Sequence, residues 1–161
     1  MERRKTRSVP LGRAAIGGTS PVLVQSMTNT DTADTEATLE QIARLEAAGC
    51  EAVRCAFYAS GCAAPFKRIK SAVKIPLIAD VHFDAGLAVL AIESGADKVR
   101  INPGNIGGER ELERVVRCAK ANGVAIRIGV NSGSLERDIF EKYAGATAEA
   151  LAQSAIRSLR F

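Results

Sequence analysis

The feature that most restricts the fold of this chain is a repeated unit, in which a helical stretch ends at a glycine and an apolar strand containing an arginine follows. The three copies span residues 46–54, 93–100 and 121–127. Similar spacing of the remaining apolar runs gives steps of about 20 to 30 residues, the length of one strand plus one helix. Strands that alternate with helices predict an α/β protein with a parallel sheet. A (β/α) barrel and a doubly wound sheet both fit this pattern.

Five apolar runs are the predicted strands, and residues between them have helical spacing. The runs are 22–24, 52–55, 75–79, 98–101 and 124–128. Asp34 and Asp84 are placed to cap the N-termini of helices, and Gly49, Gly95 and Gly123 follow helices where left-handed turns are favoured. No Gly-x-Gly-x-x-Gly motif follows the first run, so a Rossmann dinucleotide site is not supported.

Composition excludes several classes of protein. Hydrophobic residues make up 47% of the 161 residues, too many for a disordered chain. Apolar runs fall short of the ~18 residues of a membrane span and none follows the basic start, so we expect neither a membrane segment nor a signal peptide. Aromatic residues are only 4% and tryptophan is missing, which argues against nucleic-acid binding. The net charge of +4 lies partly in a basic tail, residues 3–7, expected to be solvated.

The four cysteines are Cys50, Cys55, Cys62 and Cys118, and no two form a Cys-x-x-Cys pair. Without a secretory signal they favour a reducing cytoplasm over a disulfide framework. Cys55 and Cys62 are interpreted either as small buried hydrophobic residues or as part of a metal site. We expect no metal site in this chain, because its single histidine is distant from both thiols.

Polar and charged side chains interrupt the predicted strands at or beyond their carboxyl ends. These residues are Arg54, Asp80, His82, Arg100, Asn102, Arg127 and Asn131. Spacings of two or four place each pair on one face of its strand, because side chains alternate with a period of two. Barrels and open α/β sheets build their sites at this end of the sheet.

Three arginines at one mouth would repel one another unless an anion lies among them. Guanidinium groups bind phosphate oxygens in pairs, so a phosphate or diphosphate ligand is predicted. Two glycine-containing turns, 102–108 and 129–134, could present backbone N–H groups to the same anion. The alternatives are arginines in ordinary salt bridges, and Asp80 with His82 as half of a metal site or as an acid–base pair for the anion.

Four segments resemble the family of 4-hydroxy-3-methylbut-2-en-1-yl diphosphate synthase, an iron–sulfur reductase of isoprenoid biosynthesis. They are 24–30 (VQSMTNT), 78–84 (IADVHFD), 100–107 (RINPGNIG) and 127–136 (RIGVNSGSLE). The resemblance implies reductive opening of 2-C-methyl-D-erythritol 2,4-cyclodiphosphate, with electrons from flavodoxin or ferredoxin passing through a [4Fe–4S] cluster. It also implies a homodimer in which a cluster domain closes over the partner's barrel.

The same resemblance assigns roles to residues. Arg54, Arg100 and Arg127 match the arginines that bind the diphosphate. His82 and Asn131 match positions that contact the ligand, and Asp80 and Asn102 match polar residues lining the same mouth. The family's catalytic glutamate and barrel lysine match nothing in this sequence, so no catalytic residue is assigned.

The resemblance also implies that this chain is one part of a longer enzyme. A TIM-like barrel usually needs about 250 residues, so residues 1–161 are expected to form the N-terminal part of an incomplete TIM-like (β/α) barrel, about five of eight βα units. None of the four cysteines matches a cluster ligand. We therefore expect no reductase activity from this chain alone. The alternatives are a non-catalytic, diphosphate-binding half-barrel and a barrel like that of a pterin synthase.

Overall fold

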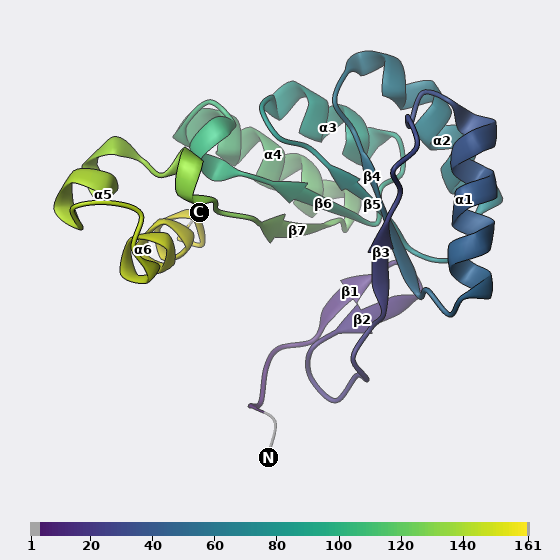
Figure 1. Cartoon of the computed structure of the whole chain (residues 1–161), viewed down its shortest axis with the longest axis horizontal. Coiled ribbons are helices and arrows are strands. Elements are labelled where there is room, and N and C mark those ends of the chain that lie inside the picture. Colours follow the sequence, from purple (N-terminus) through teal and green to yellow (C-terminus); the bar gives the residue numbers. More distant parts are fainter. Residues whose placement is uncertain (1–3, 161) are drawn as a thin grey trace.

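The structure is a computed structural model that describes residues 4–160, and it alternates parallel strands with helices (Figure 1). The strands are β1 (Val9–Leu11), β2 (Ala14–Ile16), β3 (Gln25–Met27), β4 (Ala52–Ala56), β5 (Leu77–Asp80), β6 (Lys98–Ile101) and β7 (Ala125–Ile128). The α-helices are α1 (Thr35–Ala47), α2 (Ala63–Ala72), α3 (Ala85–Glu93), α4 (Glu109–Asn122), α5 (Arg137–Lys142) and α6 (Ala148–Ser158). Short 3₁₀ turns η1 (Ser60–Cys62), η2 (Pro103–Asn105) and η3 (Ser132–Ser134) follow β4, β6 and β7.

Five strands form one parallel sheet in the order β3-β4-β5-β6-β7, which is also their order along the chain. A doubly wound sheet would reverse direction partway, whereas a barrel adds each strand beside the last. The sequential order therefore decides between the two predicted architectures. Within residues 4–160 the sheet does not close, since β3 and β7 are its edges. The predicted incomplete (β/α) barrel is confirmed.

The first predicted strand was placed three residues too early. The parallel ladder starts at Gln25, which is in register with Ala52, while Val22 and Val24 are exposed. The backbone N–H of Val24 donates to the Glu51 carboxylate at 2.7 Å instead of to a neighbouring strand. An apolar run therefore gave the wrong segment here, because the true strand is the polar Gln-Ser-Met that follows it.

The hydrophobic core lies between the sheet and the helices α1 to α4, which cover one face of it (Figure 1). Residues at odd positions of β4 to β6, such as Val53, Val99 and Ile101, are fully buried in this core. Residues at even positions point to the other face, where the helices do not reach. That second face is the interior face of the partial barrel, and it carries the charged side chains described below.

An antiparallel hairpin of β1 and β2, which the sequence analysis did not predict, covers the amino-terminal end of the interior face (Figure 1). Leu11 of this hairpin is fully buried against Ala52 and Ile78. Gly12 lies so close to the Asp97 carboxylate that a Cβ would stand 2.6 Å from its Oδ1. The hairpin closes the amino-terminal end, so a ligand has access from the carboxyl ends of the strands.

Helix boundaries follow the capping residues predicted from the sequence. Asp34 accepts a hydrogen bond from the Ala37 N–H at 3.1 Å, and Asp84 caps α3. Gly49, Gly95 and Gly123 all have positive φ. In the described part of the chain no helix is both long and apolar enough to cross a membrane. The basic tail is exposed from residue 4 onward, and Arg3 lies outside the described residues.

Candidate anion-binding site

The predicted site residues of β4 to β7 lie at the carboxyl half of the interior face. Parallel register aligns Ala56 with Asp80, Asp80 with Arg100, and Arg100 with Arg127. A second row of aligned residues lies two positions closer to the hairpin. In it, Arg54 is in register with Ile78, and Ile78 with Lys98. We call the first set the outer row (Ala56, Asp80, Arg100, Arg127) and the second the inner row (Arg54, Ile78, Lys98, Ala125).

Asp80 is the centre of the cluster and is only 3% exposed. Its Oδ1 lies 3.3 Å from Nη1 of Arg100, and its Oδ2 lies 3.5 Å from Nε of Arg54. A buried carboxylate needs such cationic partners, because without them its desolvation is unfavourable. Asp80 thus holds two of the three predicted arginines in fixed positions and links the two rows.

His82 extends the same network toward the mouth, with its side chain about half exposed. Its Nε2 lies 3.2 Å from Oδ2 of Asp80, and its Nδ1 lies 3.5 Å from Nη1 of Arg100. Arg100 can only donate. Nη1 of Arg100 also lies 3.3 Å from Nε2 of His82, so the guanidinium stands beside the imidazole ring and contacts both of its nitrogens.

The side chain of Arg100 crosses the end of β7, where Gly129 leaves space for it. A Cβ at Gly129 would lie 2.3 Å from Nε of Arg100, so no larger residue fits without displacing the guanidinium. Nη2 of Arg100 donates to the Gly129 carbonyl at 3.3 Å. Carboxylate, imidazole and carbonyl together fix the guanidinium plane and prepare it for one ligand geometry.

Arg127 is exposed on β7 and in register with Arg100, and it forms no salt bridge within residues 4–160. No carboxylate of the described residues therefore neutralises its guanidinium. Asn131 is also exposed, and its backbone carbonyl accepts hydrogen bonds from the N–H and Oγ of Ser134. The structure brings Arg54, Asp80, His82 and Arg100 together, with Arg127 alongside, and leaves the Asn131 side chain outside this network.

Asn102 is buried, and its side chain joins two loops. Its Nδ2 donates to Oγ of Ser134 at 2.7 Å, and its Oδ1 accepts from the Gly104 N–H at 3.3 Å. Gly104 packs directly on the Ser134 carbonyl, where a Cβ would collide. Asn102 thus fastens the turn after β6 to η3, the turn after β7. Both are the glycine-containing turns in which backbone N–H groups were predicted to face an anion.

Lys98 belongs to the same face, although the sequence analysis did not single it out. It is 7% exposed and stands two residues before Arg100, so the two side chains point the same way. Burial lowers the pKa of Lys98, and the nearby charges of Arg127 and Arg54 lower it further. The alternation of Lys98, Arg100 and Asn102 in the sequence could have indicated that Lys98 lies on the same face as the predicted site residues.

The interior face therefore carries an excess of positive charge. Four cations (Arg54, Lys98, Arg100 and Arg127) surround one carboxylate, Asp80, in the two rows. Cations so close together in a partly desolvated site repel one another. A bound polyanion would offset this repulsion.

The cysteines do not form a metal centre. Cys50, Cys55 and Cys62 are buried, Cys118 lies on α4, and all four are free. Burial raises the pKa of the Cys55 thiol to about 11, which disfavours the thiolate that a metal requires. Among the described residues, no three His, Cys, Asp or Glu side chains are grouped in a metal-binding arrangement. An iron–sulfur cluster does not fit these side chains.

Two loops form a rim beside the cluster. Oη of Tyr58 donates to Oδ1 of Asp31 at 2.6 Å, and this hydrogen bond raises the pKa of Tyr58 to about 12. Between this rim and β5 lies a small apolar pocket of about 130 Å³. Its lining includes Asp80, His82 and the exposed Phe83. The pocket opens beside the charged cluster.

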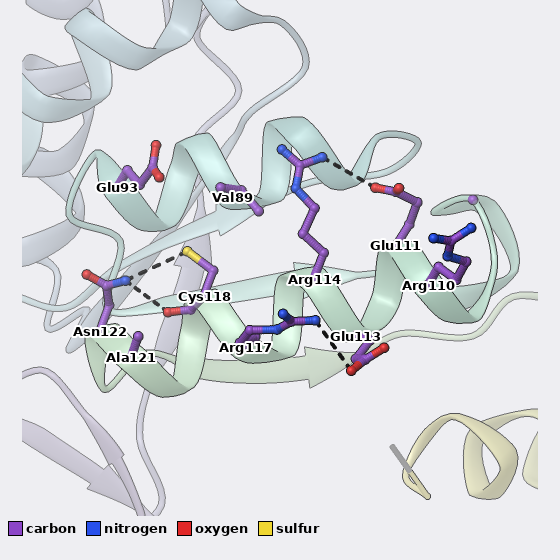
Figure 2. Close-up of a pocket in the computed structure, with 11 residues that line it drawn as sticks. Val89, Glu93, Arg110, Glu111, Glu113, Arg114, Arg117, Cys118, Ala121 and Asn122 are labelled. Carbon is purple, nitrogen blue, oxygen red and sulfur yellow. Dashed lines mark hydrogen bonds and ion pairs between the residues drawn. The ribbon is translucent and has the colours of Figure 1, made fainter.

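A larger groove of about 1000 Å³ lies on the outer face over α3 and α4 (Figure 2). Its charges are neutralised along α4, where Arg114 pairs with Glu111 and Arg117 with Glu113, each at 3.4 Å (Figure 2). Exposed pairs of this kind are ordinary features of a solvated helix. The paired charges of this groove contrast with the excess of cations at the strand ends.

Comparison with known proteins identifies close relatives of this sequence. It is 54% identical over 158 residues to 4-hydroxy-3-methylbut-2-en-1-yl diphosphate synthase (flavodoxin) from Caldanaerobacter subterraneus, covering 98% of this chain and 44% of the relative. The enzyme of the same name from Nitratidesulfovibrio vulgaris is also 54% identical, with 99% and 42% covered. The chain thus spans less than half the length of the curated relatives it matches.

A solved structure shows the same fold at low sequence similarity. The 7,8-dihydropteroate synthase from Vibrio fischeri ES114 superposes with a TM-score of 0.57 and 13% identity, over 94% of this chain and 64% of that one. The family model described as the GcpE TIM-barrel domain matches residues 6–161. Because this family model covers nearly the whole chain and the fold agrees with it, the chain belongs to the GcpE TIM-barrel family.

Proposed function

We propose that this chain is the N-terminal, diphosphate-binding part of the barrel of a 4-hydroxy-3-methylbut-2-en-1-yl diphosphate synthase. Its ligand is then 2-C-methyl-D-erythritol 2,4-cyclodiphosphate, whose ring the complete enzyme opens by reduction. The observation that carries this proposal is the cluster of four cations around Asp80 at the strand ends. The high identity to relatives bearing that enzyme's name supports the choice of ligand.

The residues of this chain bind and orient the ligand. Arg100 is held by Asp80, His82 and the Gly129 carbonyl, so little side-chain entropy is lost when it meets a phosphoryl group. Arg127 is exposed and adds a guanidinium that no carboxylate of the described chain occupies. His82 offers its ring at the mouth. Asn131 follows β7 at the same end of the sheet, with an exposed side chain.

The electron-transfer parts are assigned to the complete enzyme. A [4Fe–4S] cluster would supply the electrons for ring opening, but the cysteines of this chain do not fit it. We therefore assign the cluster to a region outside residues 1–161, and flavodoxin, named in the relatives, or ferredoxin to the donor role. A homodimer that joins the two regions and a cytoplasmic location are part of the same proposal. The four free cysteines agree with a reducing compartment.

Titration calorimetry on the 161-residue chain tests the ligand. We expect the cyclodiphosphate to bind more tightly than a pterin diphosphate, and Arg127→Met to weaken its binding by roughly 10-fold, the value of one charged hydrogen bond. Arg117→Met on the outer face of α4 removes the same charge and is the matched control. Preference for the pterin compound, or equal losses in both variants, would contradict the proposal.

An assay of reduction tests the division of labour. With a chemical electron donor, the 161-residue chain is expected to leave the cyclodiphosphate ring closed, because residues 4–160 hold no ligand set for the cluster. Formation of the open diphosphate by this chain alone would show that the chemistry resides in it. The similarity to dihydropteroate synthase concerns the fold alone and does not favour a pterin substrate.

A further inference from the structure

Lys98 is a buried cation to which the network around Asp80 gives no partner. It is 7% exposed, and within residues 4–160 its ammonium forms neither a hydrogen bond nor a salt bridge. Its neighbours in the inner row are Ile78 and Ala125, which offer no acceptor. An unpaired ammonium at such a position is unfavourable unless an anion reaches it.

The position of Lys98 also defines a second level of positive charge. Along a strand, two residues rise by about 6 to 7 Å, so Lys98 lies roughly that far below Arg100 on the same face. Arg54 shares the inner row with Lys98, whereas Arg100 and Arg127 stand in the outer row. Each row thus holds two cations, and Asp80 neutralises only one charge in total.

Two levels of cations match a ligand with two phosphoryl groups better than one. A single phosphate at the outer row would leave Lys98 without a partner. We propose that Lys98 binds the inner phosphoryl group of a diphosphate whose other phosphoryl group lies on Arg100 and Arg127. This inference rests on the proposed function, and it adds Lys98 as the residue that selects diphosphates over monophosphates.

The lowered pKa of Lys98 agrees with this geometry. Burial and the charges of Arg127 and Arg54 disfavour its cationic form, while Asp80 faces the arginines rather than Lys98. A bound phosphoryl group would supply the missing negative charge and raise that pKa. Ligand binding and proton binding at Lys98 should therefore reinforce each other.

The test compares inorganic pyrophosphate with inorganic orthophosphate on the 161-residue chain by calorimetry. We expect pyrophosphate to bind at least 10-fold more tightly. Lys98→Met, which keeps the length of the side chain, should weaken pyrophosphate binding at least 10-fold and change orthophosphate binding less than 3-fold. Lys67→Met, at an exposed position of α2, removes the same charge and should change neither.

If the circular dichroism spectrum of Lys98→Met differs from that of wild type, the variant has not folded normally. An NMR titration of the wild-type chain then tests the same role. With ¹³C-labelled lysine, the resonance that titrates at the lowest pH should shift its midpoint upward on addition of pyrophosphate, and less with orthophosphate. No shift, or the same shift with both anions, would overturn the role of Lys98.

The outcomes separate this inference from the proposed function. Unchanged pyrophosphate binding in Lys98→Met, or equal losses for both anions, would overturn the role of Lys98 while the cyclodiphosphate can still bind. Pyrophosphate binding that depends on Lys98, without any binding of the cyclodiphosphate, would keep the role of Lys98 and overturn the proposed substrate. A chain that binds neither compound would overturn both.

Discussion

The two faces of the sheet are built from alternate residues of the same strands, yet they differ completely in chemistry. The face under α1 to α4 is apolar and fully buried, with Val99 and Ile101 as examples. The interior face has Lys98 and Arg100 at the intervening positions of β6. The helix-covered face can supply the stability that tolerates a repulsive cluster on the other. The following predictions test that division.

The largest expected effect is on the helix-covered face. Phe66 of α2 is fully buried, and its ring packs edge-to-face on Phe57 at 5.5 Å. Phe66→Ala should lower the free energy of unfolding by about 3 to 5 kcal/mol, because it removes a large side chain and leaves a cavity. Urea denaturation measures this loss. The fraction that stays folded should bind the cyclodiphosphate as tightly as wild type, and weakened binding by it would show that the two faces are coupled.

Asp80→Asn tests whether the interior face contributes to stability at all. The change keeps the shape of the side chain but leaves Arg54 and Arg100 without their carboxylate. We expect a loss of about 3 kcal/mol, as for breaking other buried ion pairs. Pyrophosphate should restore more of the melting temperature in this variant than in wild type, because it replaces the missing negative charge. A variant as stable as wild type without any anion would refute the central role of Asp80.

Gly129 carries no charge, but it leaves the space that the Arg100 guanidinium occupies at the interior face. Gly129→Ala places a methyl group against Nε of Arg100 and should displace the guanidinium, with a loss of stability of about 1 to 3 kcal/mol. Calorimetry should show weaker binding of the cyclodiphosphate, although every charge is retained. Gly133→Ala is the matched control, since a Cβ there meets nothing within 4 Å. Equal binding by the two variants would mean that the position of Arg100 is unimportant.

Much of this arrangement was predictable because it depends on local rules. The period of two placed Arg100 and Asn102 on one face, and Asp34 and Asp84 marked helix starts that the structure confirms. The parallel sheet followed from the alternation of strands and helices, and the incomplete barrel from the resemblance to a known family together with the length of the chain. These features need no knowledge of which residues meet across the fold.

Other features could not be predicted because they depend on contacts between distant segments. The hairpin of β1 and β2 is defined by its packing on Ala52 and Ile78, and β3 by its pairing with β4. Asn102 was predicted to line the mouth, and its bond to Ser134 forms only when two loops meet. The importance of Gly129 depends on the path of Arg100 across β7. Sequence spacing carries none of this information.

The smallest expected effect is the contribution of Lys98 to the pH dependence of the free energy of unfolding. It is also the sharpest test of the interior face. Its pKa is lowered in the folded chain by burial and by Arg127 and Arg54. Below that pKa, folding keeps an unfavourable cation, so Lys98→Met should be more stable than wild type at pH 7. As pH rises from the folded pKa toward the value of about 10.4 for an unfolded lysine, the unfolded chain binds more protons than the native one. Wild type should then gain stability relative to the variant.

The measurement is urea denaturation of both proteins between pH 7 and pH 10. Their difference isolates Lys98, because the raised pKa of Tyr58 affects both proteins equally. The advantage of Lys98→Met should shrink steadily over this range, and pyrophosphate should reverse it at pH 7 by giving the wild-type ammonium a partner. A constant difference would show that folding does not lower the pKa of Lys98, as for an ammonium that already has a partner. Its charge would then be no part of the contrast between the two faces.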